Sequence, residues 1–388
     1  MVFKFKSFFT YLTVFFFLIS CSSQDSTTVQ GEDSTDVVTT NEDNQNDDSA
    51  DIAIPGTIRN ISSMNLVAEM GVGWNLGNSL DVENRDKTAW GNPLPTQAII
   101  DKVFDMGFRT LRIPVTWDYH QQATAPYIIE EDYLTRVQEA VNYGISKNMH
   151  VILNIHHDNS WIRPTNADAP IVKLRLASLW TQVANTFKTY GDRLIFETLN
   201  ENRLLNSPEE WIGGTEEGRN VLNEYHLEAL NAIRATGSNN TGRHIMISTY
   251  AASTIPVAMD DLIIPNNDDR VIISLHTYFP WPFAGPDDPL AVWGSDEDKA
   301  ALRAEFDRIR DKWILQEQRP VILGEWGAVD KNNLDVREGY YEFYVSESTA
   351  RGLLPIVWDD GGNFRMLDRT NLNWHFPTLA DIIVASEN

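Results

Sequence analysis

Residues 194–202 read LIFETLNEN, a strand-like apolar run that ends abruptly in Asn200 and Glu201. A second stretch, residues 321–327, has the same form, because the apolar run VILG leads directly into Glu325. Moving an unpaired carboxylate out of water costs free energy, so a carboxylate at the end of a buried strand must be hydrogen-bonded, ion-paired or functional. Two such carboxylates on two strands suggest a catalytic pair.

Similar apolar runs recur from about residue 58 and alternate with amphipathic segments, which is typical of a parallel sheet with helices outside it. Strands are predicted at 72–77, 108–115, 150–156, 194–200, 244–250, 271–277, 321–326 and 354–358. Helices are predicted at 96–106, 133–148, 171–190, 218–236, 297–316, 336–351 and 372–386, with a poorly defined one after residue 250. Eight such units over residues 58–388 predict a single (β/α)8 TIM-barrel domain of the α/β class. An open doubly wound sheet is disfavoured, because Trp74 and Asn75 occupy the turn where a glycine-rich phosphate loop would be needed.

The N-terminal residues 1–21 read as an export signal. Lys4 and Lys6 precede an apolar run at 8–19 that is about as long as a signal-peptide core and too short to span a bilayer. The run leads through Ser20 to Cys21, the only cysteine, in a context that resembles a bacterial lipobox. This predicts lipidation of Cys21 and anchoring to the outer membrane or cell surface; the alternative is an ordinary secretory signal with a chance cysteine.

Residues 22–57 are predicted to be a disordered acidic tether. Within them, residues 22–51 hold nine acidic residues, no Lys or Arg, and few large apolar side chains that could form a core. The rest of the chain is also acidic, within a total net charge of −24. Such a surface disfavours nucleic acids, which are bound through Lys and Arg. A neutral substrate is expected, the only membrane contact is the lipid anchor, and the chain is expected to be a monomer.

In a barrel of this kind the active site lies at the C-terminal ends of the strands. The predicted strand ends carry an unusual set of polar and aromatic side chains: Asn78, Arg112, His156, His157, Asp158, Asn200, Glu201, His276, Tyr278, Glu325, Trp358 and Asp360. Each one alone is as compatible with a rim ion pair or ordinary packing as with function. Their convergence on one rim favours a catalytic site.

Glycoside hydrolysis uses such a set, because it needs one carboxylic acid to protonate the leaving oxygen and one carboxylate to attack the anomeric carbon or activate water. Asn200 is suited to hold a sugar 2-hydroxyl, and Trp358 to form a flat apolar floor. Arg112 and Tyr278 would keep a nucleophile ionised through hydrogen bonds. His276 can hydrogen-bond the acid/base.

Metal-dependent and serine or cysteine hydrolase chemistry are disfavoured. His156, His157 and Asp158 are adjacent, and adjacent residues on a strand point to opposite sides, so they are not expected to hold one ion. The sequence has no G-x-S-x-G elbow, and Cys21 is assigned to the lipobox. No metal and no cofactor is predicted.

Taken together, the motifs resemble glycoside hydrolase family 5, a family of retaining (β/α)8 enzymes in clan A, and most closely its subfamily 4 of endo-β-1,4-glucanases and xyloglucanases. The matching segments are GWNLGNSLD (73–81), WGNP (90–93), GFRTLRIPVTW (107–117), LNIHHD (153–158), FETLNE (196–201), RATG (234–237), SLHTYFP (274–280), GEWG (324–327) and VWDDGG (357–362). Retention implies that the two carboxyl groups lie about 5–5.5 Å apart.

The resemblance implies a role for each matching residue. Glu201 corresponds to the acid/base and Glu325 to the nucleophile. The supporting residues it implies are Arg112, His156, Asn200, His276, Tyr278 and Trp358, with Asn78 and His157 as further glycan contacts. Two positions depart from the family pattern: Asn202 stands where proline usually follows the acid/base, and Asp360 stands where asparagine is common.

The implied partner is a plant β-glucan polysaccharide or oligosaccharide. Loop aromatics that can stack on pyranose rings are Trp90, Trp161, Phe279, Trp281, Phe283 and Trp293. Trp281 is expected to bind substrate. Cellulose, mixed-linkage glucan, xyloglucan and glucomannan all remain open as substrates. The alternative functions are a mannan- or glucomannan-directed endo-hydrolase and a cell-surface lipoprotein that binds glycans without cleaving them.

Overall fold

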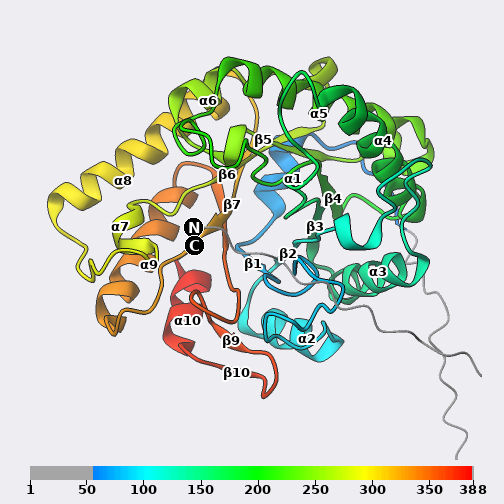
Figure 1. Cartoon of the computed structure of the whole chain (residues 1–388). Helices are drawn as coiled ribbons and strands as arrows, with labels where there is room; N and C mark the ends of the chain where they lie inside the picture. Colours follow the sequence, from blue (N-terminus) through cyan, green and yellow to red (C-terminus); the bar gives the residue numbers. More distant parts are fainter. Residues whose placement is uncertain (1–55, 387–388) are drawn as a thin grey trace, which may run out of the picture. The chain divides into compact units, whose positions relative to one another are not determined.

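The computed structural model describes residues 56–386. In this part of the chain, eight parallel strands form a closed barrel in which each strand pairs with the next, and β1 pairs with β8 (Figure 1). The strands are β1 (Gly73–Asn75), β2 (Thr110–Ile113), β3 (His150–Asn154), β4 (Leu194–Glu197), β5 (Ile245–Ser248), β6 (Val271–His276), β7 (Val321–Trp326) and β8 (Leu353–Val357). The barrel prediction is confirmed, and each predicted strand overlaps an observed one.

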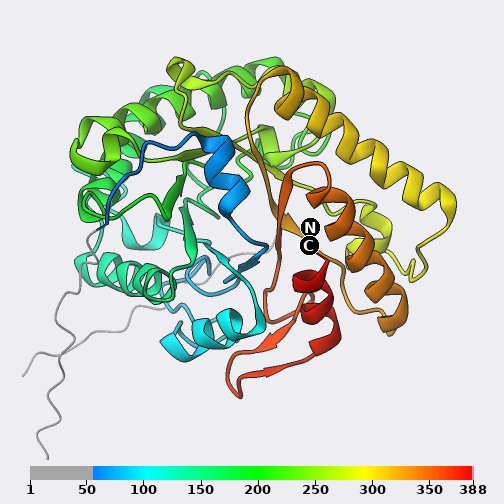
Figure 2. The same cartoon turned by 180° about the vertical axis from the view of Figure 1, so that it is seen from behind.

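Helices surround the strands (Figures 1 and 2). The main ones are α2 (Gln97–Met106), α3 (Glu131–Ser146), α4 (Ala169–Thr186), α5 (Glu216–Ala235), α8 (Asp296–Ile309), α9 (Leu334–Thr349) and α10 (Pro377–Ala385). Thr96, Thr215 and Ser295 begin three of them, because each side-chain oxygen accepts a backbone N–H that the first helical turn leaves unpaired. Among the described residues, no helix has both the length and the apolar character needed to cross a membrane.

Shorter elements connect these units. They are α1 (Ser63–Glu69), α6 (Pro256–Asp260), α7 (Trp281–Ala284), the 3-10 helices η1 (Asp118–His120), η2 (Ser238–Thr241), η3 (Tyr250–Ala252) and η4 (Pro265–Asn267), and the π-helix η5 (Arg310–Gln316) that continues α8. The poorly defined helix after residue 250 is thus only α6. The helix predicted at 372–386 begins late, because the antiparallel pair β9 (Leu367–Asp368) and β10 (Asn373–Trp374) precedes Pro377.

The predicted signal segment, Cys21 and almost all of the predicted tether lie outside the described residues. The described chain begins at Gly56, whose backbone N–H donates to the carbonyl of Thr189 and whose carbonyl accepts from Asn239. The chain is therefore bonded to the turn after α4 and to η2 two residues before the predicted domain boundary.

Side-chain alternation divides the apolar residues into two clusters. One lies between the strands and the outer helices. The other consists of strand residues of the opposite parity together with residues of α1, so it fills the barrel interior: Leu66, Val67, Met70, Ile152, Ile195, Met246, Ile272, Ile322, Leu354 and Ile356. The helix α1, blue in Figure 2, therefore covers the amino-terminal end of the barrel, and sequence patterning did not predict it.

Two residues further along the same strands, the inward side chains become polar. Asn154 follows Ile152, Glu197 follows Ile195, and Ser274 follows Ile272. All three polar residues are fully buried. Together with Arg112 and Asn75 they form a polar layer, the name used below for these five residues, which lies between the apolar interior and the cavity described next.

The barrel closes where the first and last strands meet, and side chains from both ends of the domain hold this seam. Asp359 Oδ2 accepts hydrogen bonds from Trp74 Nε1 at 2.9 Å and from the backbone N–H of Leu367 at 2.9 Å. Arg369 donates to the carbonyl of Gly77 and to that of Asp359. The segment that follows β8 is thus bonded to the loop that follows β1.

Candidate active site

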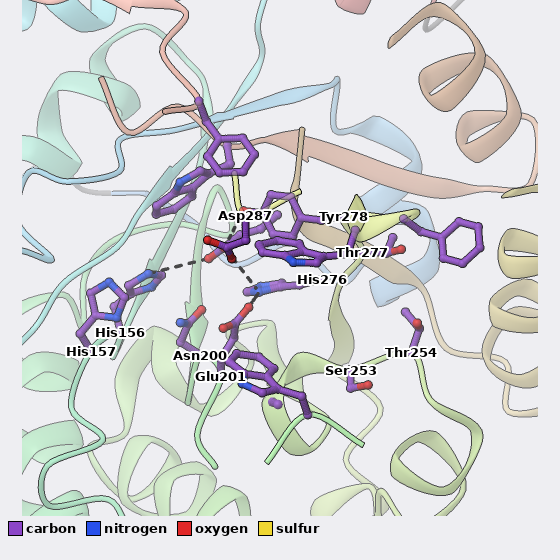
Figure 3. A pocket seen from close by; sticks show the side chains of 17 residues that line it. His156, His157, Asn200, Glu201, Ser253, Thr254, His276, Thr277, Tyr278 and Asp287 are labelled. Atoms are coloured by element: carbon purple, nitrogen blue, oxygen red, sulfur yellow. Dashed lines mark hydrogen bonds and ion pairs between the residues drawn. The ribbon is translucent and has the colours of Figure 1, made fainter. Parts of the chain in front are cut away.

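A cavity of about 790 Å³ opens at the C-terminal ends of the barrel strands. Most of the predicted site residues line it, namely His156, His157, Asn200, Glu201, His276, Tyr278, Trp281, Glu325 and Trp358. In Figure 3, His156 and His157 lie on one side of the cavity and His276 and Tyr278 on the other, with Asn200 and Glu201 between them. The structure therefore brings these side chains together from strands that are far apart in the sequence.

An irregularity in β7 aims Glu325 into the cavity. Regular alternation from Ile322 would turn Trp326 inward and Glu325 outward. The pairing register shifts at this point on both sides of β7. As a result, Trp326 packs outward against Tyr344, with 4.1 Å between the ring centroids, and Glu325 faces the cavity.

Two donors hold the Glu325 carboxyl group. Arg112 Nη1 donates to Oε1 at 2.8 Å, and the Tyr278 hydroxyl donates to Oε2 at 3.0 Å. Both hydrogen bonds favour the ionised form. Burial nevertheless raises the pKa of Glu325 above its ordinary value, against the opposing charges of His276 and Arg112.

The Glu201 carboxyl group is held by a different partner. His276 Nδ1 lies 2.7 Å from its Oε1, and Arg203 Nη1 lies 3.7 Å from its Oε2. Burial by itself raises the pKa of Glu201, but the hydrogen bond and charge of His276, with the charge of Arg203, outweigh it and hold this pKa below its ordinary value. The charges of Glu325 and Glu201, with the hydrogen bond to Glu201, raise the pKa of His276 despite its burial. Glu201 and His276 therefore compete for one proton.

The two carboxyl groups lie close together. One oxygen of Glu201, one oxygen of Glu325 and a ring nitrogen of His276 all lie within 4.8 Å of one another. Retaining glycosidases place their carboxyl groups about 5–5.5 Å apart, whereas inverting enzymes need about 6.5–9.5 Å to admit a water molecule. The spacing matches the retaining arrangement.

Gly324 makes room for the histidine between these carboxyls. A Cβ atom at this position would lie 3.0 Å from His276 Nε2 and 3.3 Å from Ser274 Oγ. At that distance the imidazole of His276 would have to shift by a few tenths of an ångström to admit any larger residue. The glycine of the motif GEWG is thus needed for close approach.

The backbone after β4 brings Asn200 to the cavity wall. Arg112 Nη2 donates to Asn200 Oδ1 at 2.7 Å, so the amide oxygen is engaged and the NH2 group is left to bind a ligand. Arg112 itself is fully buried and lies beneath the cavity, not on its lining.

Trp358 lines the cavity beside the histidine pair, with its ring nearly parallel to that of His156 and the centroids 5.6 Å apart. Of the other loop aromatics, Phe279 and Trp281 also line the cavity, and the ring of Trp90 lies 5.8 Å from that of His157. The remaining three belong elsewhere. Phe283 and Trp293 pack with Tyr340, and Trp161 donates to Asp158 and stacks on Arg175.

The prediction that His156 and His157 point to opposite sides is wrong. Both follow the end of β3, where strand alternation no longer applies, and their ring centroids are 4.3 Å apart. The nearby acid is Asp81, which with the two histidines has ligand-type atoms within 4.8 Å of one another. Asp158 is engaged elsewhere, accepting from the backbone of Trp117 and from Trp161.

The two histidines are poised as neutral groups. Burial lowers the pKa of His157 to about 4, and burial together with the charge of His157 lowers that of His156. Neutral imidazoles can bind sugar hydroxyls or a metal ion. The Asp81 carboxylate, however, already accepts the backbone N–H groups of Asn78 and Ser79.

Two further predicted residues do not line the cavity. Asn78 follows β1 in a left-handed conformation with φ 51°, and its carbonyl accepts from Asn92. Asp360 Oδ1 accepts the backbone N–H groups of Gly362 and Phe364. The Asp360 carboxylate thus holds its own loop together, and its pKa is raised by burial.

Sequence patterning missed Trp211, which lines the cavity while 58% exposed. The guanidinium of Arg203 stacks on its ring at 4.1 Å. The signal was present, since Trp211 is an aromatic residue in the loop after β4, but the aromatic residues considered came from the loops after other strands.

Glu197 was also missed, although it lies within the quoted stretch LIFETLNEN. Counting by two from the inward-facing Ile195 places Glu197 inside the barrel. Its carboxylate accepts from Arg112 Nε at 2.8 Å, from Asn154 at 3.0 Å and from Ser274 Oγ at 2.6 Å.

Asn202, which stands in place of the proline usual in the family, is almost fully buried. Its side-chain amide donates to Asn159 Oδ1 at 3.1 Å, and its carbonyl accepts from the backbone of Ala251 at 3.3 Å. Hydrogen bonds to two neighbouring loops therefore fix the backbone next to Glu201, where a proline ring would do so through its restricted φ.

Residues 57–363 match the family model described as cellulase, glycosyl hydrolase family 5. The chain is 47% identical over 337 residues to endoglucanase B of Clostridium cellulovorans, covering 84% of this chain and 76% of the relative. It is 40% identical over 349 residues to endoglucanase A of Ruminococcus albus, covering 86% of this chain and 95% of the relative.

Solved structures give the same picture. ZgEngAGH5_4 in complex with a cellotriose superimposes with a TM-score of 0.84 at 49% identity, over 85% of this chain and all of that one. A GH5-4 broad specificity endoglucanase from Clostridium acetobutylicum superimposes with a TM-score of 0.81 at 48% identity, over 84% of this chain and 99% of that one.

Proposed function

The chain belongs to glycosyl hydrolase family 5 and is an endo-β-1,4-glucanase. We propose that Glu325 is its nucleophile and Glu201 its acid/base. The observation that carries the assignment is the close pair of carboxyls with different partners. Glu325 accepts from Arg112 and Tyr278, which favours a carboxylate, whereas Glu201 shares a short contact with His276, which can supply or take a proton.

In the first step, a Glu325 oxygen attacks the anomeric carbon of a glucosyl unit and forms an ester bond. The glycosidic carbon–oxygen bond breaks at the same time, and Glu201 gives its proton to the leaving oxygen. In the second step, the Glu201 carboxylate takes a proton from water, the water oxygen attacks the anomeric carbon, and the ester bond breaks to regenerate Glu325. Two inversions at one carbon leave the β configuration unchanged.

The surrounding residues serve the sugar at the cleavage point. The free NH2 group of Asn200 is placed to bind the 2-hydroxyl, and Trp358 offers a flat face to the ring. His156, beside Trp358, is a neutral hydrogen-bonding group for a hydroxyl. Trp211, which stacks on Arg203, and Trp281, which packs against Tyr278, are exposed platforms in the cavity wall for further glucosyl units.

The roles of the two acids can be separated by leaving-group chemistry. Glu325→Gln is expected to lose activity on every substrate. Glu201→Gln is expected to lose activity on polysaccharide but to form the glycosyl-enzyme normally from an aryl cellobioside whose phenol leaves without protonation. Full activity of either variant on polysaccharide would refute the assignment, and NMR of the first product should show the β anomer.

We propose soluble β-1,4-linked glucans, including xyloglucan and mixed-linkage glucan, as substrates. The support is the cavity flanked by exposed aromatics and the description of a structural neighbour as a broad specificity endoglucanase. Comparing kcat/KM on xyloglucan, barley β-glucan, carboxymethylcellulose and glucomannan tests this. A marked preference for glucomannan would favour the mannan-directed alternative, and absence of turnover on all four would favour a glycan-binding protein.

We also propose that the mature chain is a monomeric lipoprotein anchored through Cys21, on the strength of the lipobox-like context described above. Radioactive palmitate should label the wild-type protein and not Cys21→Ser. Protease treatment of intact cells separates a cell-surface location from one that faces the periplasm, and light scattering of the domain tests its monomeric state.

A further inference from the structure

The polar layer contains a third buried carboxylate that the reaction itself does not use. Glu197 is fully buried and does not line the cavity. Each of its oxygens has a donor, with Arg112 and Asn154 bonding Oε2 and Ser274 bonding Oε1. A buried ionised group is costly, so a paired one retained beneath a catalytic site calls for a reason.

Arg112 joins this carboxylate to the catalytic groups. Its guanidinium donates through Nε to Glu197, through Nη1 to Glu325 at 2.8 Å and Asn75 at 3.0 Å, and through Nη2 to Asn200 at 2.7 Å. The planar guanidinium therefore bonds Glu197 through Nε, and the groups at the catalytic site, Glu325 and Asn200, through its two Nη atoms. Whatever fixes Glu197 also fixes the direction in which Arg112 presents its charge.

The charges in this cluster can be counted. Burial by itself raises the pKa of Glu197, but the charge and the hydrogen bond of Arg112 outweigh it, so its pKa is below the ordinary value and the group is ionised at neutral pH. One guanidinium thus faces two carboxylates, Glu197 and Glu325. The ionised Glu197 carboxylate therefore offsets the positive charge of Arg112, independently of Glu201 and His276.

The geometry points to Glu197 as a positioning residue that offsets the charge of Arg112 and thereby keeps a proton in the group formed by Glu201, His276 and Glu325. This inference rests on the proposed roles of Glu201 and Glu325. If the charge of Arg112 were not offset, it would draw protons away from both catalytic carboxyls, and the acid/base would lose its proton at a lower pH. A retaining glycosidase is active only while one carboxyl is ionised and the other protonated.

Other ionisable groups face this cluster and contribute to its field. They are Arg203 after β4, His156 and His157 after β3, His226 of α5, and Tyr278 after β6. None of these side chains changes in the test below. A shift that follows removal of the Glu197 charge alone is therefore attributable to that charge.

The test is the pH dependence of kcat/KM for Glu197→Gln, which removes the charge and keeps nearly the same volume. Because a positive charge then acts unopposed on both carboxyls, we expect both limbs of the bell-shaped profile to move to lower pH, on the order of one pH unit. Glu197→Asp, which keeps the charge, should restore the position of both limbs even where kcat is reduced.

Two controls separate charge from structure. Ser274→Ala removes one hydrogen bond to Glu197 without removing its charge, so its limbs should stay in place. Glu305→Gln removes another buried carboxylate, which pairs with Arg308 in α8 away from the cavity, and should leave the profile unchanged. Thermal unfolding of each variant reports the structural cost independently.

Unshifted limbs, or limbs moved to higher pH, in a folded Glu197→Gln variant would overturn the inference. Should that variant not fold, Glu197→Asp and Glu197→Asn repeat the charged and neutral comparison with a shorter side chain. Glu201→Gln and Glu325→Gln are measured alongside. If either keeps full activity, the proposed catalytic roles fail; if both are inactive and the Glu197 profile is unshifted, only the present inference fails.

Discussion

The two ends of the barrel interior are built on the same strands but from opposite kinds of side chain. At the amino end, Ile152, Ile195 and Ile272 pack under the helix α1. Two residues later the same strands present Asn154, Glu197 and Ser274, which with Arg112 and Asn75 form a network beneath the catalytic carboxyls. The backbone is equivalent at both levels, so the division between an apolar support and an ionic one is set by the side chains.

The difference shows what each end can tolerate. An apolar layer loses only packing when one side chain is shortened. In an ionic layer, removal of one partner leaves the others charged and unpaired in a dry environment. The amino end should therefore influence stability alone, and the carboxyl end stability and chemistry together.

The largest effect is expected for Arg112→Met. It leaves Glu197 and Glu325 without their shared cation, so we expect a loss of about 3–5 kcal/mol in unfolding free energy. Activity should fall by on the order of 10³-fold or more as a charged donor to the nucleophile is lost. Urea unfolding and kcat/KM measure the two effects.

Arg243→Met is the matched control for Arg112. Arg243 is equally buried, but its guanidinium donates to carbonyls such as those of Gly191 and Leu194, outside the site. It should lose stability and keep kcat. Comparable loss of kcat in both variants would show that activity follows stability and not the polar layer.

Ile272→Ala probes the apolar end and should cost about 2–5 kcal/mol of stability because it leaves a cavity in a fully buried cluster. Below its unfolding transition, the variant should have the kcat and pH profile of the wild type. The same substitution at Ile263, which is 61% exposed, should change stability by less than about 0.5 kcal/mol. An altered pH profile in Ile272→Ala would mean that the two ends are coupled.

Tyr278→Phe removes the hydroxyl that donates to Glu325, a hydrogen bond to a charged group worth about 1.5–3 kcal/mol. We expect kcat/KM to fall roughly 10–100-fold. Because the lost bond favoured the ionised carboxyl, the acid limb of the pH profile should move to higher pH, opposite to the shift expected for Glu197→Gln.

Tyr344→Phe serves as the control for Tyr278. Its buried hydroxyl donates to the carbonyl of Thr277, and it should leave both kcat and the acid limb unchanged. A Tyr278→Phe profile that superimposes on that of the wild type would argue against Glu325 as the group responsible for the acid limb.

The last prediction concerns stability alone, at a buried polar group that stays neutral. His226, between Thr198 and the carbonyl of Ser248, has a pKa lowered to about 4 by burial. In the unfolded chain the pKa of this histidine is about 6.5. At a pH below about 6.5, the unfolded chain therefore binds a proton that the folded chain does not bind. His226 should therefore contribute a loss of stability as the pH falls from about 6.5 to 4.

Melting temperatures across this range provide the measurement for His226. The slope against pH should be smaller in His226→Gln than in the wild type, by about one bound proton. Above pH 7 the two curves should run parallel, separated only by the hydrogen bonds lost. Identical slopes from pH 4 to 6.5 would contradict the assignment.

Much of this architecture was accessible from the sequence, because apolar runs mark the strands and a barrel places their ends together. The prediction reached Glu201, His276 and Tyr278 in this way. It did not reach the reason why Glu325 faces inward, since simple alternation from Ile322 places it outside, and only the shifted register of β7 corrects this. A register shift depends on both neighbouring strands and leaves no local pattern.

Other features were missed for different reasons. Glu197 lies two residues after the inward-facing Ile195, so strand alternation alone places it inside the barrel. The helix α1 is short, and its packing against the barrel floor depends on strands far away in the sequence. The mutual approach of His156 and His157 could not be predicted, because it arises just beyond the point where strand geometry ends.

The seam at Asp359 and Arg369 has a consequence for how this enzyme comes into being during synthesis. Both side chains belong to the last tenth of the chain, yet they bond to Trp74 and Gly77 near the start of the domain. A ribosome must therefore translate almost the whole message before the first strand can be locked in place. Only a fully translated chain is then active. A chain terminated before β8 would have no glucanase activity.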